Sequence, residues 1–380
     1  MAWSIPVLAV ALALTAPDDG SAERIPYFAR RYNVACTQCH VLPPKLNAFG
    51  EAFLANGYNL PDFESRKTWP FAVWVSGRTD LPAFDPGTRD RLTEYLNRVE
   101  VISGGPIVAP WLSYFVEWRT LSLSPRSDFS LKDRSGRFED LFLTLSADKL
   151  QVFVGQFRQV QQVDVSRRLS LSEPLLLSSS LTGDGGDTPR QQSLRGFSPA
   201  GRSPAIRAGW VQPLGDGWRW TTAAAVPFPG ELSIPLTDEA RTEASNELAL
   251  NPKGVVVESF LRRGLTSVGA HVFYDNAGRY LANALTTGNY ADFYWTGTVG
   301  IAKSAGNLRG RWSAETEYIP IPFIGGGARV EDEFEDGRSA TFVPYLNAHF
   351  PGTRYTLRLT LEHRFQAGRN ATLLELGTLF

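Results

Sequence analysis

From Trp69 to Phe380 the chain repeats runs of about ten residues in which apolar and polar side chains alternate. In one such run Tyr355, Leu357, Leu359 and Leu361 lie at every second position, and the side chains between them are polar. Because successive side chains of a strand point to opposite faces, this pattern predicts strands with one apolar and one polar face.

Short turn-forming sequences and long polar segments separate these runs in alternation. The short sequences are residues 104–106, 147–149, 214–217, 262–264, 304–307 and 350–353, and the long segments are 120–136, 158–202, 227–251 and 320–339. Short periplasmic turns with long extracellular loops are typical of transmembrane β-barrels. The count predicts about fourteen strands with both ends periplasmic, or about sixteen if segment 158–202 holds another hairpin.

A soluble periplasmic β-sandwich or propeller would show the same alternation, with the apolar face as its core. The loop asymmetry and the terminal Phe380 favour a barrel, because a C-terminal aromatic residue on an amphipathic strand resembles the recognition signal of bacterial outer-membrane proteins. A wet lumen would be lined by Glu117, Arg119, Glu258, Glu315, Glu317, Arg358 and Glu362. Interfacial girdles would include Trp69, Trp74, Trp118, Trp210, Trp218, Trp220, Tyr294 and Trp295. We therefore predict an all-β fold, a transmembrane antiparallel barrel over residues 68–380.

The first 22 residues are interpreted as a secretory signal peptide. An apolar stretch from Ile5 to Ala16 is too short for a transmembrane helix and precedes small residues, with cleavage expected after Ala22. No Lys or Arg precedes this stretch, which departs from the usual signal pattern. A net charge of -1 gives no basis for electrostatic binding of nucleic acid. The 34 glycines and 25 prolines favour strands and turns over a helical bundle.

The only two cysteines lie in the sequence Cys36-Thr37-Gln38-Cys39-His40. This spacing is the attachment signature of c-type haem, in which both thiols form thioethers and the histidine ligates the iron. A zinc site is disfavoured because zinc usually takes four ligands and no second Cys/His pair lies nearby. A disulfide between cysteines this close would be strained. The motif predicts one covalent haem c and no catalytic residue.

Residues 23–67 would form a small helical segment around this haem. A helix is expected over residues 45–54, where Leu46, Phe49 and Phe53 share one face and pack on the haem or on ordinary protein. Asn56-Gly57-Tyr58 would end it. A segment of about 45 residues is near the size that needs a cofactor or a partner to fold. We therefore expect it to plug or dock the periplasmic end of the barrel.

The second axial ligand of the haem is left open by the sequence. Met1 is the only methionine, so the mature segment lacks the commonest second ligand. Local replacements are Lys45, Asn47, the mature N-terminal amine or water. The alternation of side chains along each strand instead predicts that His271 and His349 face the lumen and that His363 faces lipid. Either His271 or His349 is therefore a candidate for the second axial ligand. An ordinary lumenal polar role is the alternative for both.

The combination resembles the fused monohaem cytochrome–porin family of bacterial outer-membrane proteins, best known for iron-oxidising cytochromes. The resemblance covers the haem motif, the Pro-x-Leu-x-x-Phe-Gly sequence at 44–50 and Asn56-Gly57-Tyr58. Residues 154–158 also look like the corresponding strand of phosphate-selective-type porins. The resemblance implies a haem that plugs the lumen from the periplasmic side and passes electrons across the outer membrane.

Three functions follow as hypotheses. The first is electron transfer from an extracellular donor such as Fe(II), through the haem, to a periplasmic cytochrome. The second is a transport porin with a structural or sensory haem plug. The third is a periplasmic cytochrome with a soluble β domain. In the first two, outer-membrane lipid surrounds the barrel.

Overall fold

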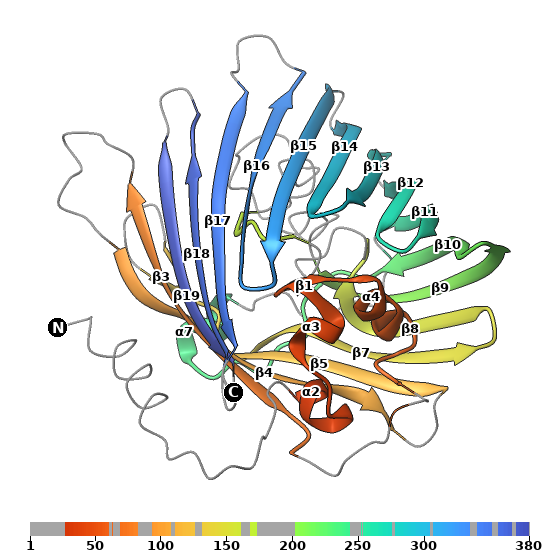
Figure 1. Ribbon diagram of the computed structural model, residues 1–380, viewed down its shortest axis with the longest axis horizontal. Coiled ribbons are helices and arrows are strands. Elements are labelled where there is room, and N and C mark those ends of the chain that lie inside the picture. Colours follow the sequence, from red (N-terminus) through yellow and green to blue (C-terminus); the bar gives the residue numbers. More distant parts are fainter. Residues whose placement is uncertain are drawn as a thin grey trace.

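The computed structural model describes most of the chain after its first 26 residues (Figure 1). The described residues are 27–60, 63, 69–82, 93–107, 111–125, 131–160, 168–172, 202–243, 252, 254–275, 278–304, 307–334, 340–351, 356–366 and 370–379. The expected signal peptide and Phe380 lie outside them.

Sixteen antiparallel strands close into a barrel, as the alternating pattern predicts. Each strand pairs with its neighbours in the chain, and β19 pairs with β3 to complete the ring. The barrel strands are β3 (Ala72–Pro82), β4 (Thr93–Pro106), β5 (Leu112–Pro125), β7 (Arg137–Ala147), β8 (Leu150–Arg158), β9 (Arg202–Gly215), β10 (Trp218–Pro227), β11 (Gly254–Arg263), β12 (Thr266–Asp275), β13 (Tyr280–Tyr290), β14 (Phe293–Ser304), β15 (Asn307–Ile321), β16 (Ile324–Glu333), β17 (Thr341–Pro351), β18 (Thr356–Arg364) and β19 (Ala371–Leu379).

Two short elements belong to the long connections. β6 (Leu131–Asp133) pairs only with the far end of β5, because β5 pairs directly with β7 in the wall. Helix α7 (Asp238–Glu243) lies in the connection between β10 and β11. Among the described residues, no helix has the length and apolar character needed to cross a membrane.

The higher of the two predicted strand numbers is correct, but the extra pair lies elsewhere than expected. Segment 320–339, interpreted as a long polar loop, contains β16 and the tight turn between Ile321 and Ile324. A second unrecognised turn joins β13 to β14 after Tyr290. Three consecutive glycines, residues 325–327, remove the side chains whose alternation would have revealed β16.

The predicted assignment of connections to the two ends also needs one correction. The short turns after β7, β9, β11, β13 and β15 lie at one end, here called the short-turn end, and the connections between β8 and β9 and between β10 and β11 lie at the long-loop end. Because strands alternate in direction, the β14–β15 turn at Ser304 belongs to the long-loop end, although it is short. The hairpin considered for 158–202 falls mostly outside the described residues.

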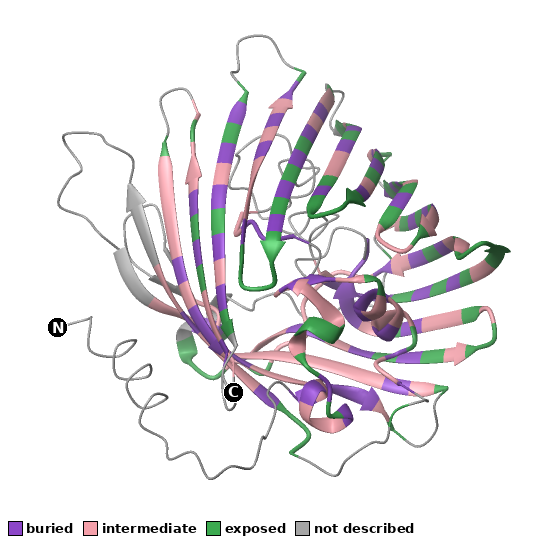
Figure 2. Ribbon diagram, in the orientation of Figure 1, coloured by how far each residue is buried: buried purple, intermediate pink, exposed green. Residues whose placement is uncertain are grey.

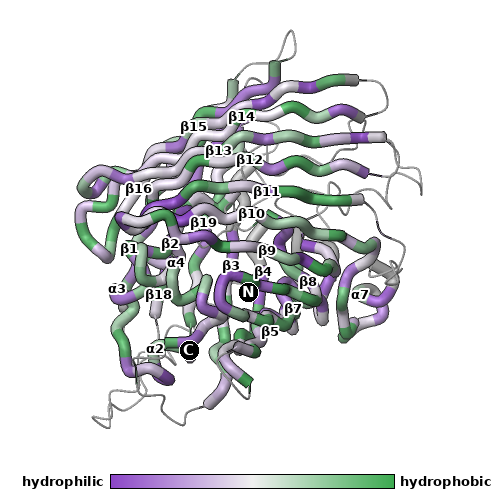
Figure 3. Tube along the Cα trace, turned by 90° about the vertical axis from the view of Figure 1, so that its right-hand side faces the viewer, coloured by the Kyte–Doolittle hydropathy of each residue, from purple (hydrophilic) through white to green (hydrophobic). Residues whose placement is uncertain are grey.

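The strands have an inner and an outer face, as predicted (Figure 2). On β12, Val268 and Val272 point outward and are exposed, whereas His271 and Phe273 point inward and are buried. Hydrophobic and hydrophilic residues follow one another along the strands of the wall (Figure 3). The seven residues predicted to line the lumen are all buried or half-buried.

Two aromatic residues assigned to the girdles face inward instead. Tyr294 is buried, with the Lys45 ammonium 5.2 Å from its ring centroid. Trp74 lies beneath the guanidinium of Arg358, 4.9 Å from the ring centroid. Both rings are therefore cation–π partners inside the barrel, where a cation is attracted to the face of the ring.

An N-terminal segment, residues 27–60, lies inside the barrel near the short-turn end (Figure 1). Its elements are α2 (Tyr27–Tyr32), α3 (Cys36–Cys39), β1 (His40–Leu42), β2 (Lys45–Leu46) and α4 (Ala48–Ala55). The helix expected over 45–54 starts later than predicted, because Lys45 and Leu46 pair with β1 and the Asn47 side chain caps α4. It ends at Ala55, as expected from the Asn-Gly-Tyr sequence.

The described part of the β8–β9 connection enters the barrel. We call Arg168–Ser172 the inner loop. Its backbone N–H groups donate to wall carboxylates, Leu169 N to Glu317 at 2.7 Å and Leu171 N to Glu362 at 2.7 Å. Arg329 of β16, which is fully buried, donates to Ser170 and Ser172 of this loop. The lumen is therefore occupied from both ends.

The apolar outer wall gives a first prediction. Val257 of β11 points outward midway along its strand, and its side chain is 46% exposed. If this wall faces hydrocarbon, V257R should lower the free energy of unfolding by about 2–4 kcal/mol. V257L should leave it unchanged within about 0.5 kcal/mol. Urea unfolding of both variants in lipid vesicles measures the difference, and an unfolding midpoint for V257R equal to wild type would contradict a lipid-facing wall.

Candidate functional site

The motif cysteines lie one helical turn apart on α3. Residues three apart in a helix share a face, so the two thiols point to the same side of the segment. Neither cysteine is in a disulfide, and both are half-buried. Burial raises the pKa of Cys39 to about 11, and the neighbouring Cys36 adds to this increase. Two protonated thiols on one face suit the covalent attachment of a single group at two points.

His40 follows α3 directly and begins β1. Its ring atom Nδ1 lies 3.1 Å from the carbonyl oxygen of Pro44. Burial lowers the pKa of His40 to about 4, although hydrogen bonds to the backbone of Pro44 and Lys45 oppose the decrease. The neutral ring has one N–H, and the contact with Pro44 assigns that proton to Nδ1, which leaves the lone pair of Nε2 as a ligand. Metal-binding histidines are oriented in this way.

Helix α4 holds the motif in place. The Asn47 side-chain amide donates to the carbonyls of Thr37 and Gln38, at 3.1 and 3.0 Å, while its oxygen accepts from Gly50 N at 2.9 Å. Gly50 packs against Cys39 so closely that a Cβ would collide with the Cys39 carbonyl oxygen. Sequence reasoning assigned no such role to Asn47 and Gly50, although both lie in the quoted motif.

The three apolar residues expected near the haem are in different surroundings. Leu46 is buried on β2, and its side chain lies against Gly50. Phe49 is half-buried, with its ring centroid 5.9 Å from that of Phe63. Phe53 is buried in an aromatic cluster within the segment. That cluster contains Phe28, Tyr32, Val34, Phe49, Phe53, Tyr58 and Leu60. Ordinary packing within the segment therefore accounts for Phe53.

Polar contacts fix the segment to the inner wall on three strands. Lys45 forms an ion pair with Glu317 of β15 at 2.5 Å, and both side chains are buried. Glu51 pairs with Arg262 of β11 at 2.6 Å. Gln151 of β8 donates to a backbone carbonyl of α4 at 2.5 Å. Arg262 and Gln151 lie next to short turns, which places the segment at the short-turn end.

Apolar contacts reach the wall between these points. The ring of Tyr58 stacks on Phe115 of β5 with centroids 4.7 Å apart. Leu42 lies against Gly325 of β16, where a Cβ would be crowded. Leu42 is fully buried in a cluster that we call the junction cluster, composed of Leu42, Leu169, Tyr294, Ile319 and Tyr345. The junction cluster joins the N-terminal segment, the inner loop and the wall.

The two candidate histidines of the barrel both face inward, as strand phase predicts. His349 of β17 is 3% exposed, and its backbone N donates to the Phe323 carbonyl at 2.8 Å, two residues from Gly325, which Leu42 contacts. His271 of β12 is 1% exposed, and its Nε2 contacts the Asn283 side-chain nitrogen at 2.9 Å. His363 contacts the Thr372 hydroxyl at 2.7 Å. The structure therefore places His349 on the part of the wall that β1 contacts, since Gly325 is the register partner of Asn347 on β17.

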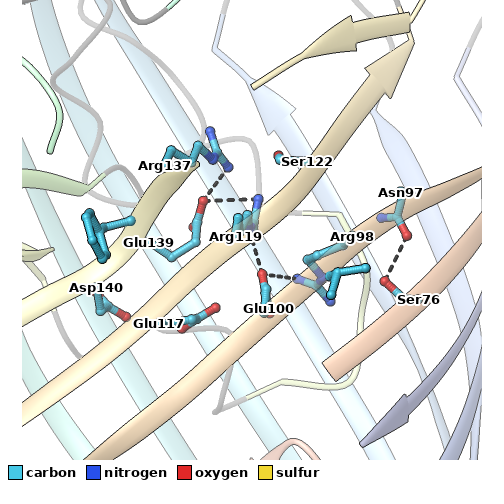
Figure 4. A network of polar contacts seen from close by, with 12 residues as sticks. Ser76, Asn97, Arg98, Glu100, Glu117, Arg119, Ser122, Arg137, Glu139 and Asp140 are labelled. Carbon is cyan, nitrogen blue, oxygen red and sulfur yellow. Dashed lines mark hydrogen bonds and ion pairs between the residues drawn. The ribbon is translucent and has the colours of Figure 1, made fainter. Parts of the chain in front are cut away.

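The inner wall also carries a network of ion pairs (Figure 4). Glu139 accepts from Arg119 at 3.0 Å and also pairs with Arg137. Glu100 pairs with Arg119 at 2.5 Å and with Arg98 at 3.5 Å. Of these residues, only Arg119 was predicted to line the lumen, since bulges in β4, β5 and β7 interrupt the alternation that would identify the others. Arginines neutralise these carboxylates.

No group of three or more His, Cys, Asp or Glu side chains within the described residues has the arrangement of a metal-ion site. The residues that can hold a prosthetic group are those of the motif. Two accessible thiols on one helical face, followed by a histidine with an oriented ring, fit a covalent c-type haem.

Solved structures resemble this chain in fold. The high-pH structure of OprB from Pseudomonas putida has a TM-score of 0.50 at 12% identity, over 87% of this chain and 95% of that one. The anion-selective porin from Comamonas acidovorans has a TM-score of 0.49 at 10% identity, over 81% and 98%. At such identities the likeness shows the fold alone, a porin-like barrel. No family model and no curated protein matches the sequence.

The buried pair of Lys45 and Glu317 gives a second prediction. Removal of one partner of a buried ion pair leaves an uncompensated charge and costs about 3–5 kcal/mol. We expect K45M to weaken the attachment of the N-terminal segment to the barrel wall. K45M/E317Q, which removes both charges, should recover most of the lost stability. Hydrogen exchange of the backbone amides of α4 measures how firmly the segment is attached. Equal protection in K45M and wild type would show that the pair contributes nothing.

The contact at Gly50 gives a third prediction. G50A forces a methyl group against the Cys39 carbonyl, and overpacking of this kind costs about 1–3 kcal/mol. Trypsin should then cut the N-terminal segment at Arg30 and Arg31 roughly tenfold faster, since a tenfold change corresponds to about 1.4 kcal/mol. The matched control is G209A, because a Cβ at Gly209 would make ordinary contacts. Identical cleavage rates for the two variants would contradict the tight packing of α4 on the motif.

Proposed function

We propose that this protein is a bacterial outer-membrane electron-transfer protein, with one haem c covalently attached to Cys36 and Cys39 and ligated by His40. The observation that carries the proposal is the seating of the motif: its segment contacts β5, β8, β11, β15 and β16 around the inner wall. An open pore does not require such a segment, whereas a redox group that is held inside the barrel requires a segment that fixes its position.

A bound haem supplies a reversible one-electron couple between Fe(III) and Fe(II). The residues of the chain position and shield that group. Cys36 and Cys39 would tether it, and His40 would present Nε2 because Pro44 holds Nδ1. Leu46 and Phe49, which follow the motif on β2 and α4, would shield it from water. The pair of Lys45 and Glu317 fixes the depth of the segment in the lumen.

The barrel supplies the route across the membrane. Its outward side chains are apolar, as lipid requires, and every strand has two neighbours, so no edge is left unpaired. With the short-turn end in the periplasm, an extracellular donor such as Fe(II) enters from the long-loop end and a periplasmic cytochrome accepts the electron. One redox centre serves both partners when it lies inside the lumen rather than in a separate domain.

A transport porin with a structural or sensory haem plug is the second candidate. The fold favours it, because OprB has a similar barrel and the alignment covers 95% of that chain. In this case the N-terminal segment restricts the pore, and solute passes beside it or after its displacement. The network of paired charges on the inner wall is compatible with a polar channel lining.

The fourth prediction separates the two functions. Purified wild-type protein should contain one covalent haem, measured from the alkaline pyridine absorption spectrum. Anaerobic addition of Fe(II) to the oxidised protein should convert its absorption bands to those of the reduced form. C36S/C39S should lack covalent haem and remain spectrally silent, while its barrel still folds.

Flux through vesicles completes the comparison. The electron-transfer function predicts little uptake of small sugars by liposomes that contain the wild-type protein, and reduction of a cytochrome inside them when Fe(II) is added outside. Rapid sugar uptake that is independent of redox state, together with a haem that Fe(II) fails to reduce, would favour the transport porin.

A further inference from the structure

We propose that His349 of β17 is the second axial ligand of the haem, on the side opposite His40. The assignment rests on the proposed function, since it requires a haem on Cys36 and Cys39. It makes the haem iron a link between the N-terminal segment and the barrel wall.

Two of the local alternatives, Lys45 and Asn47, already have other partners. Lys45 Nζ is 2.5 Å from a Glu317 carboxylate oxygen in a buried pair, and a charged ammonium has no lone pair for a metal. The Asn47 side chain makes three hydrogen bonds, to Thr37, Gln38 and Gly50. Ligation by either residue would break contacts that hold the motif together.

Contacts between the motif strand and the wall place β17 beside the motif. Leu42, two residues after His40, lies against Gly325 of β16. Gly325 is the register partner of Asn347 on β17, and His349 N donates to the Phe323 carbonyl beside it at 2.8 Å. The motif strand β1 therefore lies against the part of the wall that carries His349.

The His349 side chain has the character expected of a ligand. It is 3% exposed and points inward, and its electrostatic neighbours are His40 and Arg358. A neutral imidazole is the commonest metal ligand in proteins, and histidine is a frequent ligand of haem iron.

His271 differs from His349 in its place on the wall. Its Nε2 contacts the Asn283 side chain, and its Nδ1 is buried without a hydrogen-bond partner among the described residues. Four strands, β13 to β16, separate β12 from β17 in the ring of the barrel. His271 is equally buried and equally inward, so it is a matched control for His349.

The test is the spin state of the oxidised protein, measured by absorption and electron paramagnetic resonance in detergent micelles. Two imidazole ligands give a six-coordinate, low-spin haem. H349A should become high-spin with an unchanged covalent haem content, and added imidazole should restore the low-spin spectrum. H271A should have the wild-type spectrum.

A second variant covers the case in which H349A fails to fold, which its migration on unheated gels would reveal. H349M should remain six-coordinate and low-spin with a higher reduction potential, because methionine ligation raises the potential of a haem. Spectra and potentials of H349A and H349M that both equal wild type overturn the assignment of His349. Absence of covalent haem from the wild-type protein overturns the proposed function, and this assignment with it.

Discussion

The Glu317 carboxylate is the point on which three parts of the structure converge. Lys45 of the N-terminal segment, Leu169 N of the inner loop and the Tyr345 hydroxyl of β17 all contact it, at 2.5, 2.7 and 3.2 Å. A buried charge is tolerated only when it is paired and hydrogen-bonded. The position of the segment and the position of the loop are therefore linked, because each supplies part of what this carboxylate requires. The junction cluster adds apolar contacts at the same place.

This arrangement explains how a segment with only a small core of its own is held in one position. Its internal core is one aromatic cluster around Phe53, and its remaining order comes from the wall. The contacts at Glu51 and Tyr58 lie on other strands than Glu317, so they restrain the segment against rotation as well as displacement. A prosthetic group on α3 would then have a fixed orientation in the lumen, which is what electron transfer at a defined distance needs and what solute transport does not.

The sequence was informative wherever a local pattern of side chains is enough to predict the structure. Alternation predicted the barrel and the inward orientation of His271 and His349, and the cysteine spacing pointed to the candidate site. It failed at Gly325 and its two neighbours, where a strand has no side chains to alternate. It also failed at Tyr294, where a ring typical of the membrane interface pairs with Lys45 instead. Those features depend on contacts between distant parts of the chain, such as residues 45 and 317, which no local pattern contains.

Seating and ligation are separate tasks in this design, although they share one region. The ion pair and the aromatic stack fix the N-terminal segment through side chains other than His40 and His349. In the proposed arrangement, loss of His349 would therefore change what the haem iron binds without removing the contacts that hold the segment. Conversely, loss of Lys45 loosens the segment while both histidines remain. A ligand on the wall would need a motif held at a fixed depth, and the ion pair of Lys45 and Glu317 meets that requirement without any bound group.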